Sequence, residues 1–264
     1  MNVFILGGKG FVGSAMAREA RRRGHNVQII DLDEYSMFVG HHCDLFINAD
    51  GNSKKFMADE DHNREFELSF SSVKRSLQDF PCERYLLCST ADVYTDTSDP
   101  ANNAETTALD ICAQSNYGFH KYLAEQYVRH YHHKWMICRF GGFVGPGIVK
   151  NPIFDILNDK SLWVSPQSEM QYLNTDKAAE TVFELVEKDL FGEIFNVGGS
   201  GTVKLSDVIE WAGKTESAST VKENVPVIRY RINTEKLNRY VSIPSSVDMV
   251  REFVENWPDS GKVS

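Results

Sequence analysis

The sequence predicts an α/β protein with a doubly wound parallel sheet and a small C-terminal lobe. Short apolar runs with strand character alternate with helical patterns through the first 140 residues. A glycine-rich loop lies between the first expected strand and the first expected helix. The alternation stops after Phe140, where a Gly/Pro-rich stretch begins, so the chain is expected to leave the sheet there.

The elements of the expected sheet follow in chain order. Strands are expected at residues 2–6, 26–31, 44–49, 84–89 and 135–140. Helices are expected at residues 11–23, about 59–79 and 115–133. Gly24 supplies the glycine that commonly follows the last turn of a helix. The residues that recur with helical spacing in the second helix are Phe66, Phe70, Val73 and Leu77.

The second half of the chain is expected to interleave with the first. Residues 141–152 have the composition of a loop, and residues 193–199 are expected to return as a strand. Helices are expected at 176–188, from 205, and at 243–257 with Pro244 in the first turn. The expected division is a core of residues 1–145, joined by 174–199, and a lobe of residues 146–173 and 200–264.

Charge and composition narrow the classes of partner and compartment. The 264-residue chain has a formal net charge of −9, which argues against nucleic acid as the main partner. Five cysteines without a CxxC pair are typical of reduced thiols in the cytoplasm. No apolar stretch has the length of a membrane helix, and the N-terminal residues resemble a strand, not a signal peptide. The protein is therefore expected to be cytoplasmic, without a membrane partner.

Three histidines near the end of one expected helix raise the question of a metal site. His130, His132 and His133 lie within four residues, but no cysteine or carboxylate accompanies them at ligand spacing. Histidines at a helix C-terminus also interact favourably with the helix dipole. No metal site is therefore expected.

The loop GGKGFVG, residues 7–13, has the pattern of a phosphate-binding turn. Glycines at such a turn let the backbone approach a pyrophosphate, which then lies at the positive end of the following helix. Asp31 ends the second strand, where an acid accepts hydrogen bonds from ribose hydroxyls and repels a 2′-phosphate. A dinucleotide site that prefers NAD to NADP is therefore expected. Its residues are Gly7, Gly10, Phe11, Val12, Gly13 and Asp31.

Tyr117 and Lys121 lie four residues apart in a predicted helix and therefore share one face. A tyrosine can exchange a proton with a carbonyl or alcohol oxygen while a hydride moves to or from nicotinamide. A nearby ammonium favours the phenolate form of that tyrosine, and Lys121 can also hold the nicotinamide ribose. Thr90, at the end of the fourth strand, can hydrogen-bond the same substrate oxygen.

Together these motifs resemble the extended short-chain dehydrogenases/reductases, the family of NAD-dependent sugar epimerases and dehydratases. The matching segments are GGKGFVG, STADVY, YGFHKYLAEQYV, RFGGFVGPG, LNTDKAAE and FNVGG. The resemblance implies a Rossmann fold, with Tyr117 as acid/base, Lys121 as its helper and Thr90 as the hydroxyl partner. It also implies that Asn48 and Ala49 line the cofactor cleft.

The resemblance further implies a homodimer in which two long helices of each subunit pair as a four-helix bundle. The aromatic residues on those helices are Phe66, Phe70, Tyr122 and Tyr127. Burial of these side chains within one subunit is the alternative explanation.

The chain departs from the family pattern where the substrate is expected to bind. Gly142 stands where relatives that bind nucleotide sugars usually carry Asn, and SEMQYLNTD lacks their Arg. Lys150, Arg229 and Arg231 remain candidate cations for a diphosphate. In dehydratases two adjacent acids follow the threonine, whereas Ala91 and Asp92 follow it here. Because dehydration needs both an acid and a base, this argues against dehydration and leaves Thr90, Asp92 and Gly142 as candidate substrate contacts.

These observations predict an NAD-dependent epimerase or oxidoreductase that acts on a sugar or nucleotide-sugar carbinol. The residues do not separate an epimerase from a dehydrogenase or reductase. The alternative is a dinucleotide-binding protein that has lost catalysis and acts as a sensor or assembly factor.

Overall fold

The computed structural model describes residues 1–52, 55–215 and 222–257. The chain folds as two compact units. The first unit comprises Met1–Thr95, Glu105–Phe140 and Ala179–Asn196. The second comprises Asp96–Ala104, Gly141–Ala178 and the chain from Val197 onward. The second unit thus takes in residues 96–104, 141–145, 174–178 and 197–199, which were expected in the core.

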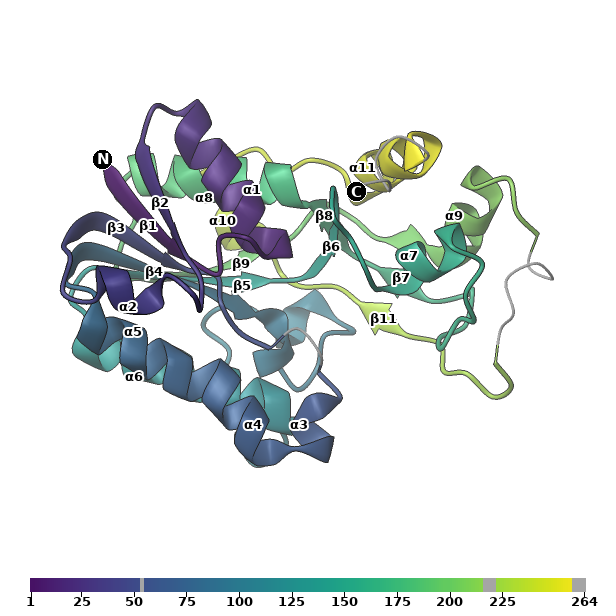
Figure 1. Cartoon of the computed structure of the whole chain (residues 1–264). Coiled ribbons are helices and arrows are strands. Elements are labelled where there is room, and N and C mark those ends of the chain that lie inside the picture. The colour runs from purple at the N-terminus through teal and green to yellow at the C-terminus, as the bar shows by residue number, and fades with distance from the viewer. Residues whose placement is uncertain (53–54, 216–221, 258–264) are drawn as a thin grey trace. The chain divides into compact units, whose positions relative to one another are not determined.

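A six-stranded sheet with the order β2-β1-β3-β4-β5-β9 forms the centre of the first unit (Figure 1). The pairs from β2 through β5 are parallel, with Val3 opposite both Val27 and Leu45. The order reverses between β1 and β3, and ligands of such sheets bind at the carboxyl ends of the strands on either side of this point. The strands are β1 (Asn2–Leu6), β2 (Asn26–Ile30), β3 (Cys43–Asn48), β4 (Cys82–Thr90), β5 (Trp135–Phe140) and β9 (Glu193–Val197).

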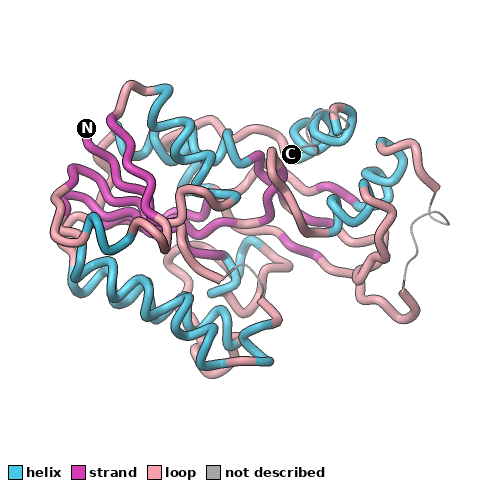
Figure 2. Tube along the Cα trace, viewed as in Figure 1, coloured by secondary structure: helices cyan, strands magenta, loops and turns pink. Residues whose placement is uncertain are grey.

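Helices cover both faces of this sheet, as a doubly wound fold requires (Figures 1 and 2). On one face lie α1 (Phe11–Arg22) and α8 (Thr175–Glu187), and on the other α5 (Ser72–Asp79) and α6 (Asn116–Tyr131). The Phe46 ring stacks on Phe80 at 5.0 Å and on Tyr85 at 5.4 Å. Each such buried ring contributes roughly 1.5–3 kcal/mol through removal of apolar surface from water.

The segment between β3 and β4 is not the single helix predicted for residues 59–79. It forms α3 (Met57–Glu60), α4 (His62–Phe66), a π-helical turn (Glu67–Ser71) and α5. Asp61 lies between α3 and α4, where its side chain accepts a 3.0 Å hydrogen bond from the Arg64 amide. A residue that caps a helix in this way has non-helical backbone angles, so the helical pattern is interrupted there. The short helix α2 (Tyr35–Phe38) was not predicted.

The second unit contains small sheets that the sequence analysis missed. β6 (Gly142–Val144) pairs in parallel with β8 (Tyr172–Asn174), so the predicted loop at 141–152 begins with a strand. A three-stranded sheet has the order β10-β7-β11. These strands are β7 (Glu169–Met170), β10 (Val203–Lys204) and β11 (Arg229–Tyr230). The helices are α7 (Pro152–Leu157), α9 (Leu205–Trp211), α10 (Glu235–Asn238) and α11 (Ser246–Glu255). Two 3₁₀ turns are η2 (Ala91–Val93), in the first unit, and η3 (Pro100–Asn102), in the second.

The last helix begins three residues later than predicted. Ser245 caps α11 by accepting a 3.3 Å hydrogen bond from the Asp248 amide. Pro244 precedes this cap, and its carbonyl oxygen accepts a 2.8 Å hydrogen bond from the Ser200 amide. The proline therefore lies outside the helix and not in its first turn.

Candidate active site

The glycine loop connects β1 to α1 through backbone contacts that side chains would prevent. Gly7 has a φ of +74°, and a Cβ there would lie 2.9 Å from the Asp50 Cα and amide nitrogen. A Cβ on Gly13 would collide with the carbonyl oxygen of Gly7. Backbone atoms therefore contact each other directly, without intervening side chains, where the loop after β1, the start of α1 and the loop after β3 come together. A pyrophosphate site at a helix N-terminus requires such an arrangement.

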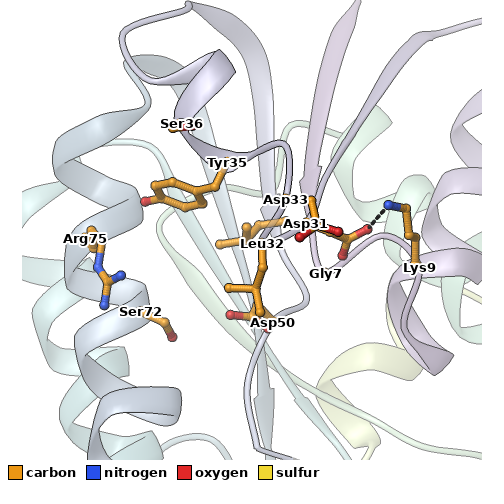
Figure 3. A pocket seen from close by; sticks show the side chains of 11 residues that line it. Gly7, Lys9, Asp31, Leu32, Asp33, Tyr35, Ser36, Asp50, Ser72 and Arg75 are labelled. Carbon is orange, nitrogen blue, oxygen red and sulfur yellow. Dashed lines mark ion pairs between the residues drawn. The ribbon is translucent and has the colours of Figure 1, made fainter.

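A pocket of about 650 Å³ opens beside this loop (Figure 3). Gly7 and Asp31 line it, as the sequence predicted for cofactor residues. Further lining residues that sequence reasoning missed include Lys9, Tyr35, Asp50, Ser72 and Arg75. They come from separate segments that only the fold brings together, although Lys9 stands within the glycine motif itself.

Asp31 points toward Lys9 in this pocket (Figure 3). Its Oδ2 atom lies 3.4 Å from the Lys9 ammonium nitrogen, which also lies 2.9 Å from Glu34 Oε1. Apart from this ion pair with Lys9, the buried Oδ2 atom of Asp31 has no hydrogen-bond partner within the described part of the chain. An acceptor of this kind fits a ribose hydroxyl, so the glycine cradle and Asp31 together fit a dinucleotide.

The start of α6 sets the position of Tyr117 and Lys121. Ser115 caps the helix by accepting a 3.1 Å hydrogen bond from the Gly118 amide. A Cβ on Gly118 would collide with the Asp92 carbonyl oxygen, so glycine lets the first turn of α6 pack directly on the backbone after β4. Tyr117 and Lys121 consequently lie close to the carboxyl end of β4.

The environment of the pair shifts both pKa values. Lys121 is 4% exposed, and its ammonium donates a 3.3 Å hydrogen bond to the Cys88 carbonyl oxygen. Burial lowers the pKa of Lys121. Burial raises the pKa of Tyr117, and the negative charges of Asp92 and Glu65 raise it further. A cation that enters the site would therefore lower the pKa of the Tyr117 phenol and favour release of its proton.

Thr90 and Asp92 form a closed pair at the end of β4. The Thr90 hydroxyl donates a 2.8 Å hydrogen bond to Asp92 Oδ2 and accepts a 3.1 Å hydrogen bond from the Asp92 amide. The Asp92 carboxylate in turn accepts a 2.6 Å hydrogen bond from the Lys55 ammonium. Lys55 was missed by sequence reasoning, because nothing in the loop after β3 marks it as a partner of Asp92.

Comparisons with known proteins identify the family of the chain. The model of the NAD dependent epimerase/dehydratase family matches residues 3–198. The chain belongs to this family. A search of curated proteins finds no sequence that matches the chain significantly.

Solved structures of epimerase/dehydratase folds superpose on almost the whole chain. A UDP-galactose 4-epimerase is 19% identical, with a TM-score of 0.76 over 98% of this chain and 99% of that one. A dTDP-glucose 4,6-dehydratase from Bacillus anthracis, in complex with NAD, is 17% identical, with a TM-score of 0.79 over 100% and 98%. A dTDP-4-dehydrorhamnose reductase from the same organism, in complex with NADP, is 16% identical, with a TM-score of 0.77 over 96% of each chain. These neighbours catalyse three different reactions, so the likeness shows the fold and leaves the reaction to the site residues.

Behind the Thr90 loop of this epimerase/dehydratase family member lies a buried polar chain that sequence reasoning missed. Ser89 donates a 2.5 Å hydrogen bond to Glu125. Arg139 forms a 2.6 Å ion pair with the same carboxylate and donates a 2.9 Å hydrogen bond to the Tyr94 hydroxyl. Tyr94 donates to Asn196 at 2.8 Å. This network of buried polar side chains joins β4, α6, β5 and β9. It thereby fixes the strand end that carries Thr90 relative to the helix that carries Tyr117.

A second buried group lies beside the Tyr–Lys face of α6. Glu65, in α4, is fully buried and contacts the His120 imidazole and the Ser69 hydroxyl. His120 lies in the Tyr-xxx-Lys segment of α6, where its sequence position allows either a substrate contact or a place on a neighbouring face of the helix. In the structure its side chain faces α4, where Phe66 packs edge-on against it at 5.2 Å.

The remaining predicted contacts are placed as follows. Asn48 is fully buried, and its amide donates to Ser76 at 3.1 Å and to the Tyr85 hydroxyl at 2.9 Å. Its Oδ1 accepts a 3.1 Å hydrogen bond from the Asp50 amide, so Asn48 shapes the loop that carries Asp50 into the pocket. Direct contact of Asn48 and Ala49 with a cofactor stays a prediction, as does the role of Phe11 and Val12.

Gly142 belongs to the second unit and lies in β6. A Cβ there would lie 2.8 Å from the Gln171 carbonyl oxygen and 2.9 Å from the Tyr172 ring. This close approach of β6 to β8 leaves little room for a side chain at residue 142. Contact of Gly142 with a substrate stays a prediction.

The described residues hold neither a cluster of metal-binding side chains nor a membrane-spanning helix. Residues 1–52, 55–215 and 222–257 contain no group of three or more His, Cys, Asp and Glu side chains arranged to hold a metal ion. Within the same part of the chain, no helix combines the length and the apolar character needed to cross a membrane.

Proposed function

We propose that this chain is an NAD-dependent epimerase or oxidoreductase that acts on a sugar or nucleotide-sugar carbinol, with Tyr117 as the acid/base. The observation that carries the proposal is the placement of Tyr117 and Lys121 on one face of α6, with the Lys121 ammonium 3.3 Å from the Cys88 carbonyl oxygen at the end of β4. Bound nicotinamide supplies the hydride acceptor or donor for such a reaction.

The cofactor would be held by Gly7, Gly10 and Gly13 at the start of α1 and by Asp31 at the end of β2. The Asp31 carboxylate, whose Oδ2 atom has no partner besides the Lys9 ion pair within the described residues, supports a ribose contact, and its negative charge favours NAD over NADP. Lys9, 3.4 Å from Asp31, partly offsets this charge. NAD is therefore proposed as the preferred cofactor, with NADP bound more weakly.

The residues of the site divide the proton chemistry among them. As the carbinol is oxidised, the Tyr117 phenolate takes its hydroxyl proton, and the Lys121 ammonium favours that phenolate before the transfer. Thr90 already donates its proton to Asp92, so it meets a substrate hydroxyl as an acceptor. A single acid follows Thr90, which supports redox or epimerisation and not dehydration.

The decisive variant is Tyr117→Phe. It keeps the ring and removes the hydroxyl, so we expect kcat to fall by about 100-fold or more, while the affinity for NAD by calorimetry stays at the wild-type value. Nucleotide sugars are screened for reduced nicotinamide by absorbance and for epimers by proton NMR. Wild-type turnover in the variant would refute the role of Tyr117. An absence of turnover in the wild type with every sugar, with NAD bound, would favour a sensor or assembly protein.

We also propose a homodimer through α4, the π-helical turn and α6. Phe70 lies 5.6 Å from Tyr127, which lies 4.3 Å from Tyr131, and Tyr131 is 60% exposed. Phe70 and Tyr127 are partly buried, so the row ends in one exposed aromatic residue, and exposed aromatic residues are enriched in subunit interfaces. Sedimentation equilibrium of the wild type and of Tyr131→Glu tests this: a dimer that the substitution dissociates supports the interface, and a wild-type monomer contradicts it.

A further inference from the structure

Two cysteines and a histidine meet at the amino-terminal ends of β3 and β4. Cys43 and Cys82 are the first residues of these strands and lie directly opposite each other in the parallel pair. Their side chains therefore project from the same face of the sheet. The glycine loop and Thr90 lie at the other, carboxyl ends of the strands, so this cluster is separate from the proposed active site.

His132 completes the cluster from the end of α6. Its Nε2 atom lies 3.5 Å from the Cys82 sulfur and 3.3 Å from the Cys82 carbonyl oxygen. Because a carbonyl oxygen only accepts hydrogen bonds, the tautomer with a proton on Nε2 fits these contacts, and Nε2 is then the donor. The Tyr85 ring packs against the imidazole at 5.8 Å, which holds the donor in place beside the sulfur.

We propose that Cys82 is a site of reversible oxidation by hydroperoxides, and that Cys43 is the thiol that closes a disulfide with it. Neighbouring strands lie about 4.8 Å apart, which falls within the Cα separation of about 4.4–6.8 Å that disulfides accept. Both residues begin their strands, where a small adjustment of backbone disturbs few ladder hydrogen bonds.

The electrostatics of the pair suit these two roles. The hydrogen bond from Cys43 lowers the pKa of the Cys82 thiol, and the His132 donor lowers it further although burial opposes both. The same contact with Cys82, together with burial, raises the pKa of Cys43. Cys82 is partly exposed and Cys43 is buried. The accessible thiol is thus the one that ionises, which is the form that attacks a peroxide.

The chemistry balances in two steps. The Cys82 thiolate attacks a hydroperoxide oxygen, so an S–O bond forms, the O–O bond breaks, and the hydroxide or alkoxide released takes a proton from solvent. The resulting sulfenic acid is attacked by the Cys43 thiol: the S–S bond forms, the S–O bond breaks, and water leaves with the thiol proton. A dithiol reductant restores both thiols and is itself oxidised to a disulfide.

The other cysteines provide internal comparisons for the test. Cys112 is exposed, so accessibility alone predicts that it reacts first. Burial raises the pKa values of Cys88 and Cys138, so both are expected to stay unmodified. Preference for Cys82 over Cys112 would therefore reflect activation by its neighbours and not exposure.

The experiment treats the full chain with equimolar hydrogen peroxide and maps the products by peptide mass spectrometry. We expect a dithiothreitol-reversible Cys43–Cys82 cross-link, formed roughly tenfold faster than oxidation of Cys112, because the thiolate and not the thiol reacts. In Cys43→Ser the sulfenic acid cannot condense and is expected to be captured by dimedone on Cys82. His132→Gln keeps an N–H donor without the imidazole and is expected to slow the reaction severalfold.

The wild-type measurement needs no substitution, so it tests the proposal even where a variant folds poorly. Oxidation of Cys112 ahead of Cys82 without a Cys43–Cys82 cross-link would overturn it. An unchanged rate in a folded His132→Gln variant would remove His132 from it. Activity is not the readout, so the outcome is independent of the proposed enzymatic function.

Discussion

The Thr90 hydroxyl donates its proton to Asp92, and the Asp92 carboxylate is held in turn by Lys55. The residue predicted to bind the substrate oxygen is therefore already engaged as a donor. A substrate hydroxyl can donate to the remaining lone pair of Thr90, whereas a substrate carbonyl would need the Thr90–Asp92 bond to break. We therefore propose that Thr90 favours the alcohol form of the substrate.

Asp92 is expected to set the pH dependence of alcohol oxidation. Its negative charge is one of the causes that raise the pKa of Tyr117, and oxidation needs the phenolate. Activity should therefore rise with pH through this pKa. In Asp92→Asn the like charge is gone, so the pKa falls and the acid limb of the kcat/KM profile moves to lower pH. The control is Glu83→Gln, which removes an exposed charge from β4. An equal shift in both variants would contradict a specific effect of Asp92.

The Glu125–Arg139 pair is expected to be intolerant of single substitutions. Arg139→Leu leaves the fully buried Glu125 carboxylate without its cation. The free energy of unfolding should fall by about 3–5 kcal/mol, as measured by urea denaturation. Replacing both residues, with Glu125→Leu and Arg139→Met, removes the two charges together. The double variant should be more stable than either single variant. If its free energy of unfolding fell by the sum of the two single losses, the two charges would not depend on each other as proposed.

Gly13→Ala is expected to disrupt the cofactor loop. Its Cβ would collide with the Gly7 carbonyl oxygen, so the loop must move from the position in which it approaches a pyrophosphate. The affinity for NAD should fall by about tenfold or more by calorimetry. Gly24→Ala is the matched control, because Gly24 has a φ of +78° but open space around it. That variant should lose about 1 kcal/mol of stability and keep its affinity. Equal affinities in the two variants would refute the role of Gly13.

Asp31→Ser is expected to shift the cofactor preference toward NADP. The substitution removes the carboxylate that repels a 2′-phosphate and releases the Lys9 ammonium from one of its two partners. The ratio of the Kd values for NADP and NAD should fall by about tenfold. Adding Lys9→Ala should restore much of the original preference for NAD, because the cation available to a 2′-phosphate is then removed. If neither substitution changed the ratio of the Kd values, the adenosine ribose would not bind at Asp31.

Much of the first unit follows from sequence, because each strand and helix carries a local pattern. The five strands at 2–6, 26–31, 44–49, 84–89 and 135–140 coincide with β1–β5 to within two residues. The misses depend on contacts between distant segments. β6 is only three residues long and exists because β8 pairs with it. Pro244 precedes the cap of α11, and there its carbonyl oxygen accepts a hydrogen bond from the distant Ser200 amide.

The site shows the same contrast. Motif spacing placed Tyr117 and Lys121 on one face of a helix, and the structure has them there. Lys55 pairs with Asp92 across 37 residues of chain, and no local pattern announces such a contact. The same holds for Arg139, which a strand sequence presents as an ordinary polar residue but which the fold buries against Glu125.

The π-helical turn at Glu67–Ser71 constrains how this protein can vary in length. There the Ser72 amide bonds to the carbonyl of Glu67, five residues earlier, so the turn holds one residue more than an α-helical turn. Deleting one residue here would restore a regular helix and leave the residues after it on their present faces. Val73 and Ser76, now buried, would therefore still face the sheet. Deleting one residue within α5, which has no extra residue to lose, would instead rotate everything after the deletion by about 100°.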